Sequence, residues 1–336
     1  MKKMQNVVYV LSRGKKLSVK NGCICISDED GKYVTIPVHN IESVVCFGEM
    51  SITTPFMGFC SENNVSISFL TENGTYYGSF YGCQKGNVFL RTNQYKVFEN
   101  ERLSLKIACS IIDTKLKNSV RVIEKSDVRN SRTEKAVLKI SEIRKHICEV
   151  KDKEELRGFE GVAAALYFSV FDDMISTDDF RMKFEKRTRR PPENNVNSLL
   201  SFVYTLLEND VRAAVESTGL DSQAGFLHTM DYGKHSLILD MMEEYRAPLC
   251  DRFVLGLINR RQIKPEDFIR TDGRIFLTDE AKRKVINLWQ DRKSAEIYHN
   301  VLDEKINVGL IPFAQARLMS SYLRGNMSEY IPFNWR

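Results

Sequence analysis

Three segments of this sequence, all beyond residue 150, place a side chain that can bind a metal among small or apolar neighbours. Glu160 is flanked by glycines and alanines, and each glycine destabilises a helix by about 1 kcal/mol relative to alanine. His228 follows the apolar run Gly-Phe-Leu. Asp240 and Glu243 are three residues apart, so a helix would place both carboxylates on one face. Two carboxylates this close repel each other unless a cation relieves the conflict.

Each of these side chains also has an ordinary structural explanation. Glu160 could be a solvated surface carboxylate, His228 a hydrogen-bonded packing residue, and Glu243 one half of an ion pair with Arg246. Taken together, Glu160, His228 and Glu243 supply oxygen donors and one nitrogen, a set that suits Mg²⁺ or Mn²⁺. Such an ion could polarise a phosphodiester and stabilise charge on the attacking and leaving oxygens. Because the three residues lie far apart in the sequence, folding would have to bring them together.

Residues 1–95 have the pattern of a small β domain with one short helix. Apolar residues recur there with a period of two, as in half-buried strands, and the pairs Asn21-Gly22 and Asn73-Gly74 are typical of hairpin turns. We expect strands at residues 7–11, 17–26, 33–38, 43–47, 66–70 and 76–80, and a helix from Pro55 to Glu62.

From residue 96 to residue 336 the apolar pattern changes to the helical period of 3.6, which predicts a larger all-α domain that carries the chemistry. Helices are expected at residues 95–123, 133–148, 154–175, 197–218, 236–259, 279–291 and 312–323. The predicted fold class is therefore α+β, with the β domain first and the helical domain second.

The composition is that of an ordinary globular protein, with 336 residues and a formal net charge of +5. This charge is too small to identify a nucleic-acid-binding protein by itself. No apolar run reaches the roughly 18–20 residues that span a membrane, and the N-terminal residues lack the long apolar region of a signal peptide. The eight cysteines include no Cys-x-x-Cys pair, so we expect reduced thiols in a cytoplasmic protein.

The three polar segments resemble the motifs of the CRISPR-associated adaptation integrase, the Cas-one family. Leu-Arg-Gly-Phe-Glu160-Gly-Val-Ala-Ala-Ala-Leu-Tyr-Phe resembles the Glu motif of that family. Gly-Phe-Leu-His228 is similar to its His motif, and Leu-Asp240-Met-Met-Glu243-Glu-Tyr-Arg-Ala-Pro to its acidic motif. The resemblance covers essentially the whole chain, including residues 37–48 near the N-terminus.

The resemblance implies a metal-dependent DNA integrase and endonuclease that acts in spacer acquisition, a step of bacterial or archaeal antiviral defence. It would join the 3′-hydroxyl ends of double-stranded foreign DNA fragments to the repeat of a CRISPR array by phosphodiester transesterification. The implied partners are a second copy of the chain, forming a homodimer, and a small Cas subunit of ferredoxin-like fold. We expect residues 1–95 to serve these two contacts, because their charge is mixed.

The implied ligands of Mg²⁺ or Mn²⁺ are Glu160, His228 and Glu243. The last position is Asp in many relatives, and Glu reaches one methylene further. Asp240 matches an additional acidic position that could orient the ligand set or a metal-bound water.

DNA binding requires cations and polar groups beside this site. Arg157 and Arg246 lie near Glu160 and Glu243 in the sequence, and each could pair with a phosphate or with those carboxylates. The basic stretch 183–190 could be a phosphate-contacting loop or a solvated surface. The DNA-binding candidates are Arg157, Arg187, Arg189, Arg190, Asn197, Ser201, Tyr204 and Arg246. Asn197 and Ser201 could instead cap the helix that follows the loop, and Tyr204 could be a packing or hydrogen-bonding residue.

Two other functions remain open for the same residues. One is a general metal-dependent nuclease of the same fold with no role in array expansion. The other is a non-catalytic DNA-binding scaffold, in which Glu160, His228 and Glu243 form structural ion pairs only.

Overall fold

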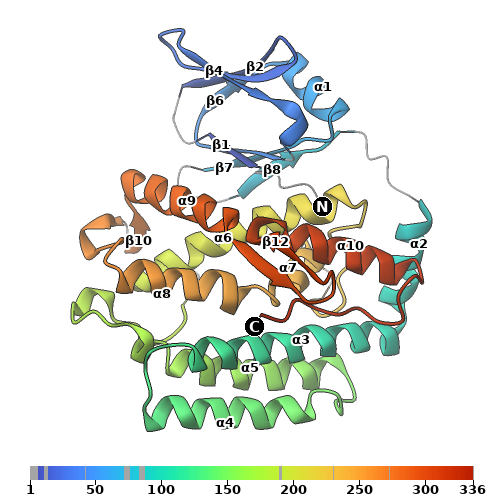
Figure 1. Cartoon of the computed structure of the whole chain (residues 1–336), viewed down its shortest axis with the longest axis vertical. Coiled ribbons are helices and arrows are strands. Elements are labelled where there is room, and N and C mark those ends of the chain that lie inside the picture. The colour runs from blue at the N-terminus through green and yellow to red at the C-terminus, as the bar shows by residue number, and fades with distance from the viewer. Residues whose placement is uncertain are drawn as a thin grey trace. The chain divides into compact units, whose positions relative to one another are not determined.

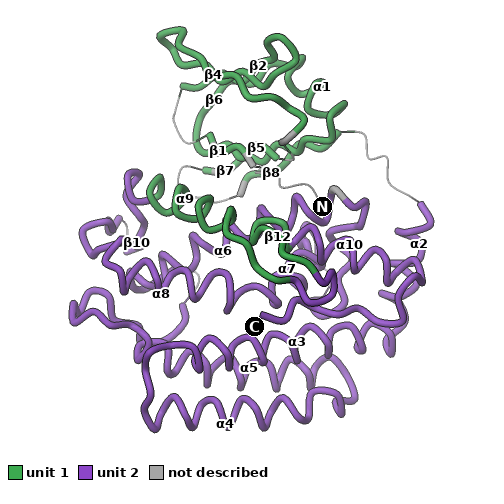
Figure 2. The backbone as a smooth tube through the Cα atoms, viewed as in Figure 1, with its two compact units in different colours: residues 1–86, 282–298, 304–311 green, residues 87–281, 299–303, 312–336 purple. Residues whose placement is uncertain are grey.

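The computed structural model describes residues 7–10, 14–41, 43–71, 76–82, 88–188, 191–229, 231–271 and 273–335. The chain forms two compact units, each discontinuous in sequence (Figure 2). Unit 1 comprises residues 1–86, 282–298 and 304–311, and unit 2 comprises residues 87–281, 299–303 and 312–336. The predicted boundary at Tyr95 lies inside a helix, α2 (Val88–Glu99).

The β part of unit 1 contains two four-stranded sheets (Figure 1). In the first sheet the order is β1-β5-β7-β8, with the first three strands parallel and β8 antiparallel to β7. In the second the order is β4-β3-β2-β6, with β6 parallel to β2 and the other pairs antiparallel. The strands of the first sheet are β1 (Val7–Val10), β5 (Ser43–Phe47), β7 (Ser66–Leu70) and β8 (Tyr76–Phe80). Those of the second are β2 (Lys15–Lys20), β3 (Cys23–Ser27), β4 (Tyr33–Pro37) and β6 (Met50–Ile52).

A single apolar core joins both sheets to helix α1 (Thr54–Glu62). Leu17 from the second sheet, Ile67 from the first and Phe56 from α1 are all fully buried in it. The predicted hairpin between β2 and β3 is confirmed. Asn21 and Gly22 both have positive φ, 52° and 69°, as a tight turn between right-twisted strands requires. The other predicted turn, Asn73-Gly74, lies outside the described residues.

Unit 2 is mostly helical, and its first helices begin at well-defined caps. The side chains of Asn100, Asn130, Asp152 and Asn194 accept hydrogen bonds from backbone N–H groups of the first helical turn, which satisfies donors that a helix start leaves unpaired. The capped helices are α3 (Glu101–Glu124), α4 (Ser131–His146), α5 (Lys153–Ser169) and α6 (Asn195–Ser217). Helices α3, α4 and α5 all pack against one another (Figure 1), so α3 and α5 can present side chains to a common site.

The C-terminal third adds elements that the helical period does not predict. Helices α9 (Asp279–Ser294) and α10 (Ile311–Leu323) occur where helices were expected. Two short hairpins also form, β9 (Phe268–Thr271) with β10 (Arg274–Leu277), and β11 (Glu296–His299) with β12 (Glu304–Asn307). Their strands are four residues long, too short for a period of two to be distinguished from a helical pattern. No helix among the described residues has the length and apolar character to cross a membrane.

The expected helix over residues 236–259 is interrupted in the structure. It divides into α7 (Ser236–Met242), a π-helical turn over Arg246–Asp251, and α8 (Arg252–Asn259). The reason is Pro248, which has no N–H to donate to the carbonyl of Glu244 four residues earlier. The side-chain amide of Asn118 donates to that carbonyl instead, at 2.9 Å. The interruption falls beside Glu243, and such turns occur frequently at functional sites.

Candidate metal centre

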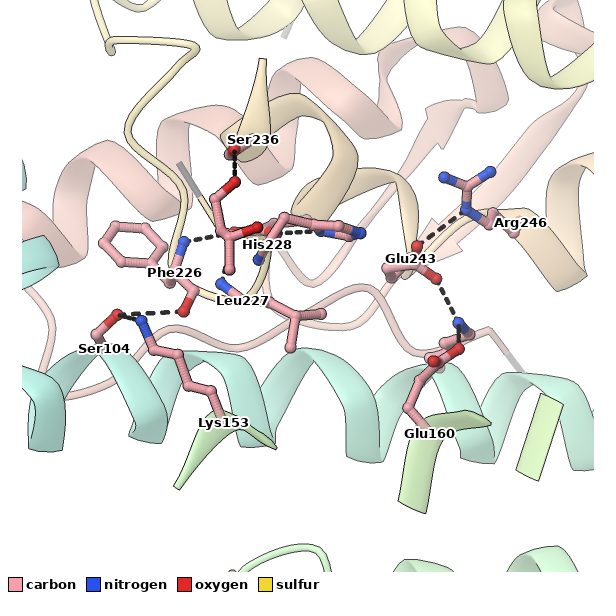
Figure 3. Close-up of polar contacts among 12 residues, drawn as sticks. Ser104, Lys153, Glu160, Phe226, Leu227, His228, Ser236, Glu243 and Arg246 are labelled. Carbon is pink, nitrogen blue, oxygen red and sulfur yellow. Dashed lines mark hydrogen bonds and ion pairs between the residues drawn. The ribbon is translucent and has the colours of Figure 1, made fainter. Parts of the chain in front are cut away.

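A lysine joins two of the three predicted metal ligands. Nζ of Lys115, on α3, contacts Oε1 of Glu160, on α5, and lies 2.6 Å from Oε2 of Glu243, which directly follows α7 (Figure 3). The other oxygen of Glu243 accepts a hydrogen bond from Nε of Arg246 at 3.1 Å. The side chains of Lys115, Glu160 and Glu243 are only 15%, 26% and 8% exposed. The fold thus brings Glu160 and Glu243 to one cationic atom, as the two carboxylates of a metal site require.

The charges in this cluster stabilise one another. Burial raises the pKa of Glu243, but the nearby charges of Lys115 and Arg246 lower it, and the net result is a pKa below the usual range. Burial lowers the pKa of Lys115, but Glu243 and Glu160 raise it above its ordinary value. Both shifts favour an ionised Glu243 beside a charged Lys115.

The third predicted ligand, His228, is held by Asp240. Nδ1 of His228 lies 2.6 Å from Oδ1 of Asp240. The Asp240 carboxylate is completely buried and also accepts hydrogen bonds from the backbone N–H groups of Phe226, Leu227 and His228. With the proton on Nδ1 directed to this carboxylate, Nε2 is left as the electron-pair donor, the arrangement common among metal-binding histidines. In Figure 3 the imidazole of His228 points toward the side on which Glu243 lies.

The glycine that precedes the His228 segment is required by this arrangement. A Cβ atom on Gly225 would lie 2.6 Å from Oδ2 of Asp240 and equally close to the backbone of Ser236. A second chain of contacts fixes the segment from the other side. Lys153 donates to the hydroxyl of Ser104 at 2.6 Å, and Ser104 donates to the carbonyl of Phe226 at 3.2 Å.

The donor set fits a divalent ion in its chemistry. It offers two carboxylates that converge on one cation, and an imidazole whose tautomer is fixed by a buried aspartate. Within the described residues, however, no group of three or more His, Cys, Asp or Glu side chains is close enough together to hold a metal. Lys115 lies where the two carboxylates meet, and His228 is paired with Asp240. The assignment of Glu160, His228 and Glu243 as ligands therefore stays a prediction.

A small pocket opens beside the cluster, lined in part by Lys115, Glu160, Tyr204, Arg246 and Asp251. Its volume is about 40 Å³, enough for about three or four water molecules at roughly 10–15 Å³ each. The ring of Tyr204 lies under the guanidinium of Arg246, 4.9 Å from its carbon to the ring centre. The pocket thus combines positive charge with the edge of the carboxylate cluster.

The hydroxyl of Tyr204 has a defined structural partner. It donates to Oδ1 of Asp251 at 2.6 Å. Burial, together with the charge of Asp251, raises the pKa of Tyr204 well above its usual value. Burial likewise raises the pKa of Asp251 to about 6, against the lowering effect of its hydrogen bonds. Tyr204 is therefore a protonated donor, as the packing and hydrogen-bonding alternative predicts.

The basic loop is attached to α6 by two of the other DNA-binding candidates. Arg187 donates to Oδ1 of Asn197 at 2.9 Å and to the hydroxyl of Ser201 at 3.2 Å. Asn197 is completely buried and donates to the backbone of the loop at Lys186. Asn197 holds the loop and presents no surface to DNA in this structure. The helix cap is Asn194, which accepts from the N–H of Asn197, so neither Asn197 nor Ser201 is the cap.

The remaining basic candidates come from α5 and from the basic stretch 183–190. Arg157 is half-buried on α5, one turn before Glu160. In the loop, Lys183 and Lys186 pair with Asp172 and Glu193 at 3.5 and 3.8 Å, so part of the positive charge is balanced locally. Arg189 and Arg190 lie outside the described residues.

Lys115 and Asp251 were missed by the sequence analysis. No local pattern distinguishes Lys115, since a lysine on an amphipathic helix normally lies on its solvated face. For Asp251 the available signal was Pro248, three residues earlier. A proline inside a predicted helix indicates that the helix is interrupted there, and Asp251 lies in that interruption.

Comparison with known proteins now adds to this geometry. The family described as "CRISPR associated protein Cas1" matches residues 8–291. A CRISPR-associated endonuclease Cas1 from Chlorobaculum tepidum is 41% identical over 345 residues, covering 100% of both chains. The solved structure of a Cas1 protein from Thermotoga maritima has a TM-score of 0.85 at 29% identity, over 98% of this chain and 100% of that one. A casposase bound to integration product has the same fold, with a TM-score of 0.84 at 22% identity over 98% and 94% of the two chains. The chain belongs to the Cas1 family of CRISPR-associated proteins.

Proposed function

We propose that this protein is a metal-dependent DNA integrase and endonuclease of CRISPR spacer acquisition. The observation that carries the proposal is the convergence of Glu160 and Glu243 on one cation, close to an imidazole fixed by Asp240. In a member of the Cas1 family, this donor set supports cleavage and joining of phosphodiesters. The reaction would be an attack of a 3′-hydroxyl on a repeat phosphate, in which one P–O bond forms and another breaks.

Glu160, His228 and Glu243 would hold the Mg²⁺ or Mn²⁺ ion, which when bound would neutralise charge on the phosphodiester and draw the reacting oxygens together. Asp240 would keep the proton of His228 on Nδ1. Arg246, which lines the pocket, would balance Glu243 and attract a phosphate. A covalent intermediate on Tyr204 is disfavoured, because its hydroxyl donates to Asp251 and its pKa is raised.

The partners belong to the same proposal. We infer that the substrate is double-stranded DNA fragments and a CRISPR array, and that the protein works as a homodimer with a small ferredoxin-like Cas subunit. Arg157 and Arg187, with Arg189 and Arg190, remain candidates for phosphate contacts.

One observation favours the alternative of a non-catalytic scaffold. Lys115 and Arg246 already neutralise Glu160 and Glu243, as structural ion pairs would. Activity therefore has to decide between the two functions.

The test is Mn²⁺-dependent joining of DNA fragments to a supercoiled plasmid that carries the array, with the small Cas partner present. We expect His228→Ala to abolish joining, because a ligand is lost, while the protein remains folded. His146→Ala is the matched control, since this histidine lies exposed on α4 and forms surface ion pairs. Joining by His228→Ala at the wild-type rate would exclude the metal assignment. Cleavage without joining in the wild type would favour the general nuclease, and neither activity would favour the scaffold.

A further inference from the structure

The cation between the two candidate ligands is supplied by the chain itself. Lys115 belongs to α3, whereas Glu160 lies on α5 and Glu243 follows α7. Its ammonium contacts one oxygen of each carboxylate. Three separate elements are therefore joined by one side chain at the point where a metal would have to bind.

Without a cation at this point, the two carboxylates would repel each other. Both are largely buried, and like charges repel more strongly where water is excluded. Arg246 contacts the other oxygen of Glu243, so it neutralises Glu243 but does not link that residue to Glu160. Among the described residues, it is Lys115 that connects the carboxylates of Glu160 and Glu243.

An ammonium at this position is also easy to displace. It is a compact charge on a flexible four-carbon stem, unlike the rigid planar fork of an arginine. A divalent ion carries twice its charge and can accept lone pairs from both carboxylates. The ammonium and the ion cannot occupy the same position.

We propose that Lys115 is a built-in competitor of the metal ion: it holds Glu160 and Glu243 together in the metal-free protein and is displaced when a divalent ion binds. This inference rests on the proposed function for its second half, the displacement. Its first half, the stabilisation of the metal-free site, is a property of the chain alone. Lys115 is thus a positioning residue that sets metal affinity.

The experiment compares Lys115→Met with Lys106→Met, which removes an exposed lysine from the same helix. In EDTA, we expect Lys115→Met to lower the midpoint of thermal unfolding by roughly 5–10 °C, because two buried carboxylates lose their shared partner. Calorimetric titration with Mn²⁺ should show binding at least about tenfold tighter than in the wild type, because the competing charge is gone. Lys106→Met should match the wild type in both measurements.

A second variant keeps the test decisive if Lys115→Met folds poorly. Glu160→Gln removes one of the two negative charges, so the double variant Lys115→Met/Glu160→Gln should recover most of the lost unfolding midpoint in EDTA. No loss in Lys115→Met, or no recovery in the double variant, would overturn the stabilising role. Unchanged or weaker Mn²⁺ binding by Lys115→Met would overturn the competition. If the wild type binds no Mn²⁺, both the proposed function and the competition between Lys115 and the metal are excluded. The unfolding measurements in EDTA would still test whether Lys115 stabilises the metal-free site.

Discussion

Glu243 and Glu244 are adjacent in the sequence but lie in opposite electrostatic environments. Glu243 contacts two cations, Lys115 and Arg246, and is ionised. Glu244 is completely buried and accepts from three neutral donors: the Tyr330 hydroxyl, the Gln315 amide at 3.0 Å and the Phe333 N–H at 2.7 Å.

Neutral donors and countercharges act differently on a buried carboxylate. Burial raises the pKa of Glu244 to about 7, and its hydrogen bonds only partly oppose this rise. Burial acts on Glu243 too, yet the two cations bring its pKa below the usual range. Of these two residues, only the ionised carboxylate, Glu243, is suited to bind a metal. Glu244 instead links Gln315, Tyr330 and Phe333 to the helical turn next to the site by hydrogen bonds.

The largest difference between the two glutamates should appear in activity. We expect Glu243→Gln to reduce Mn²⁺-dependent joining by at least roughly 10²–10³-fold, because an amide is a poor substitute for an anionic ligand and several kcal/mol of charge stabilisation are lost. Glu244→Gln should keep most of the wild-type rate, because its side chain faces neutral partners. A gel assay of plasmid-joined products measures both. An equal loss of joining activity in Glu244→Gln and Glu243→Gln would contradict the predicted difference between the two glutamates.

A smaller difference should appear in the pH dependence of stability. The pKa of Glu244 is about 7 in the folded protein and about 4.3 in an unfolded chain, so between these values the folded state binds more protons. The free energy of unfolding should then fall as pH rises from 5 to 8, by roughly 2–3 kcal/mol from this residue. Urea unfolding in EDTA of the wild type and of Glu244→Gln would measure it, and the variant should lack this share of the slope.

Glu243 should have the opposite pH dependence. Because its folded pKa is lowered, its contribution is present above pH 4–5 and is lost as the pH falls further. For Glu244, an equal slope between pH 5 and 8 in the wild type and in Glu244→Gln would show that its pKa is not raised in the folded protein.

The smallest effect is expected from Tyr330→Phe. This change removes one donor of Glu244 and leaves the ring in place, so the free energy of unfolding should fall by about 1–2 kcal/mol. Mn²⁺ binding, measured by calorimetry, should be unchanged, since Tyr330 contacts none of the candidate ligands. A weaker Mn²⁺ affinity in this variant would show that the two glutamates are coupled.

Local patterns predicted most of the fold. The period of two located the strands of the β part except β6 (Met50–Ile52), and Asn21-Gly22 marked a turn that requires positive φ at both residues. The discontinuity of unit 1, which includes residues 282–298, could not be predicted in this way, because it depends on contacts between segments far apart in the chain.

The candidate site could also be predicted only in part, because only some of its residues carry a local signal in the sequence. Glu160 and Glu243 stand out as charges among small or apolar neighbours, so their type and setting are local signals. Lys115 and the partners of Glu244 carry no such signal, since their significance lies in what they contact after folding. Of two adjacent glutamates, the sequence could not show which one would meet cations and which one neutral donors.

The hydrogen bonds to Glu244 also have a consequence for folding during translation, because their donors are synthesised well after Glu244. Its donors come from residues 315, 330 and 333, and Asn118, which replaces the donor that Pro248 lacks, also contacts the backbone of Phe333 and Trp335. Until these residues have been translated, Glu244, next to Glu243, lacks the hydrogen bonds that they donate. A nascent protein would therefore complete the surroundings of Glu243 only after residues 315, 330 and 333 have been synthesised.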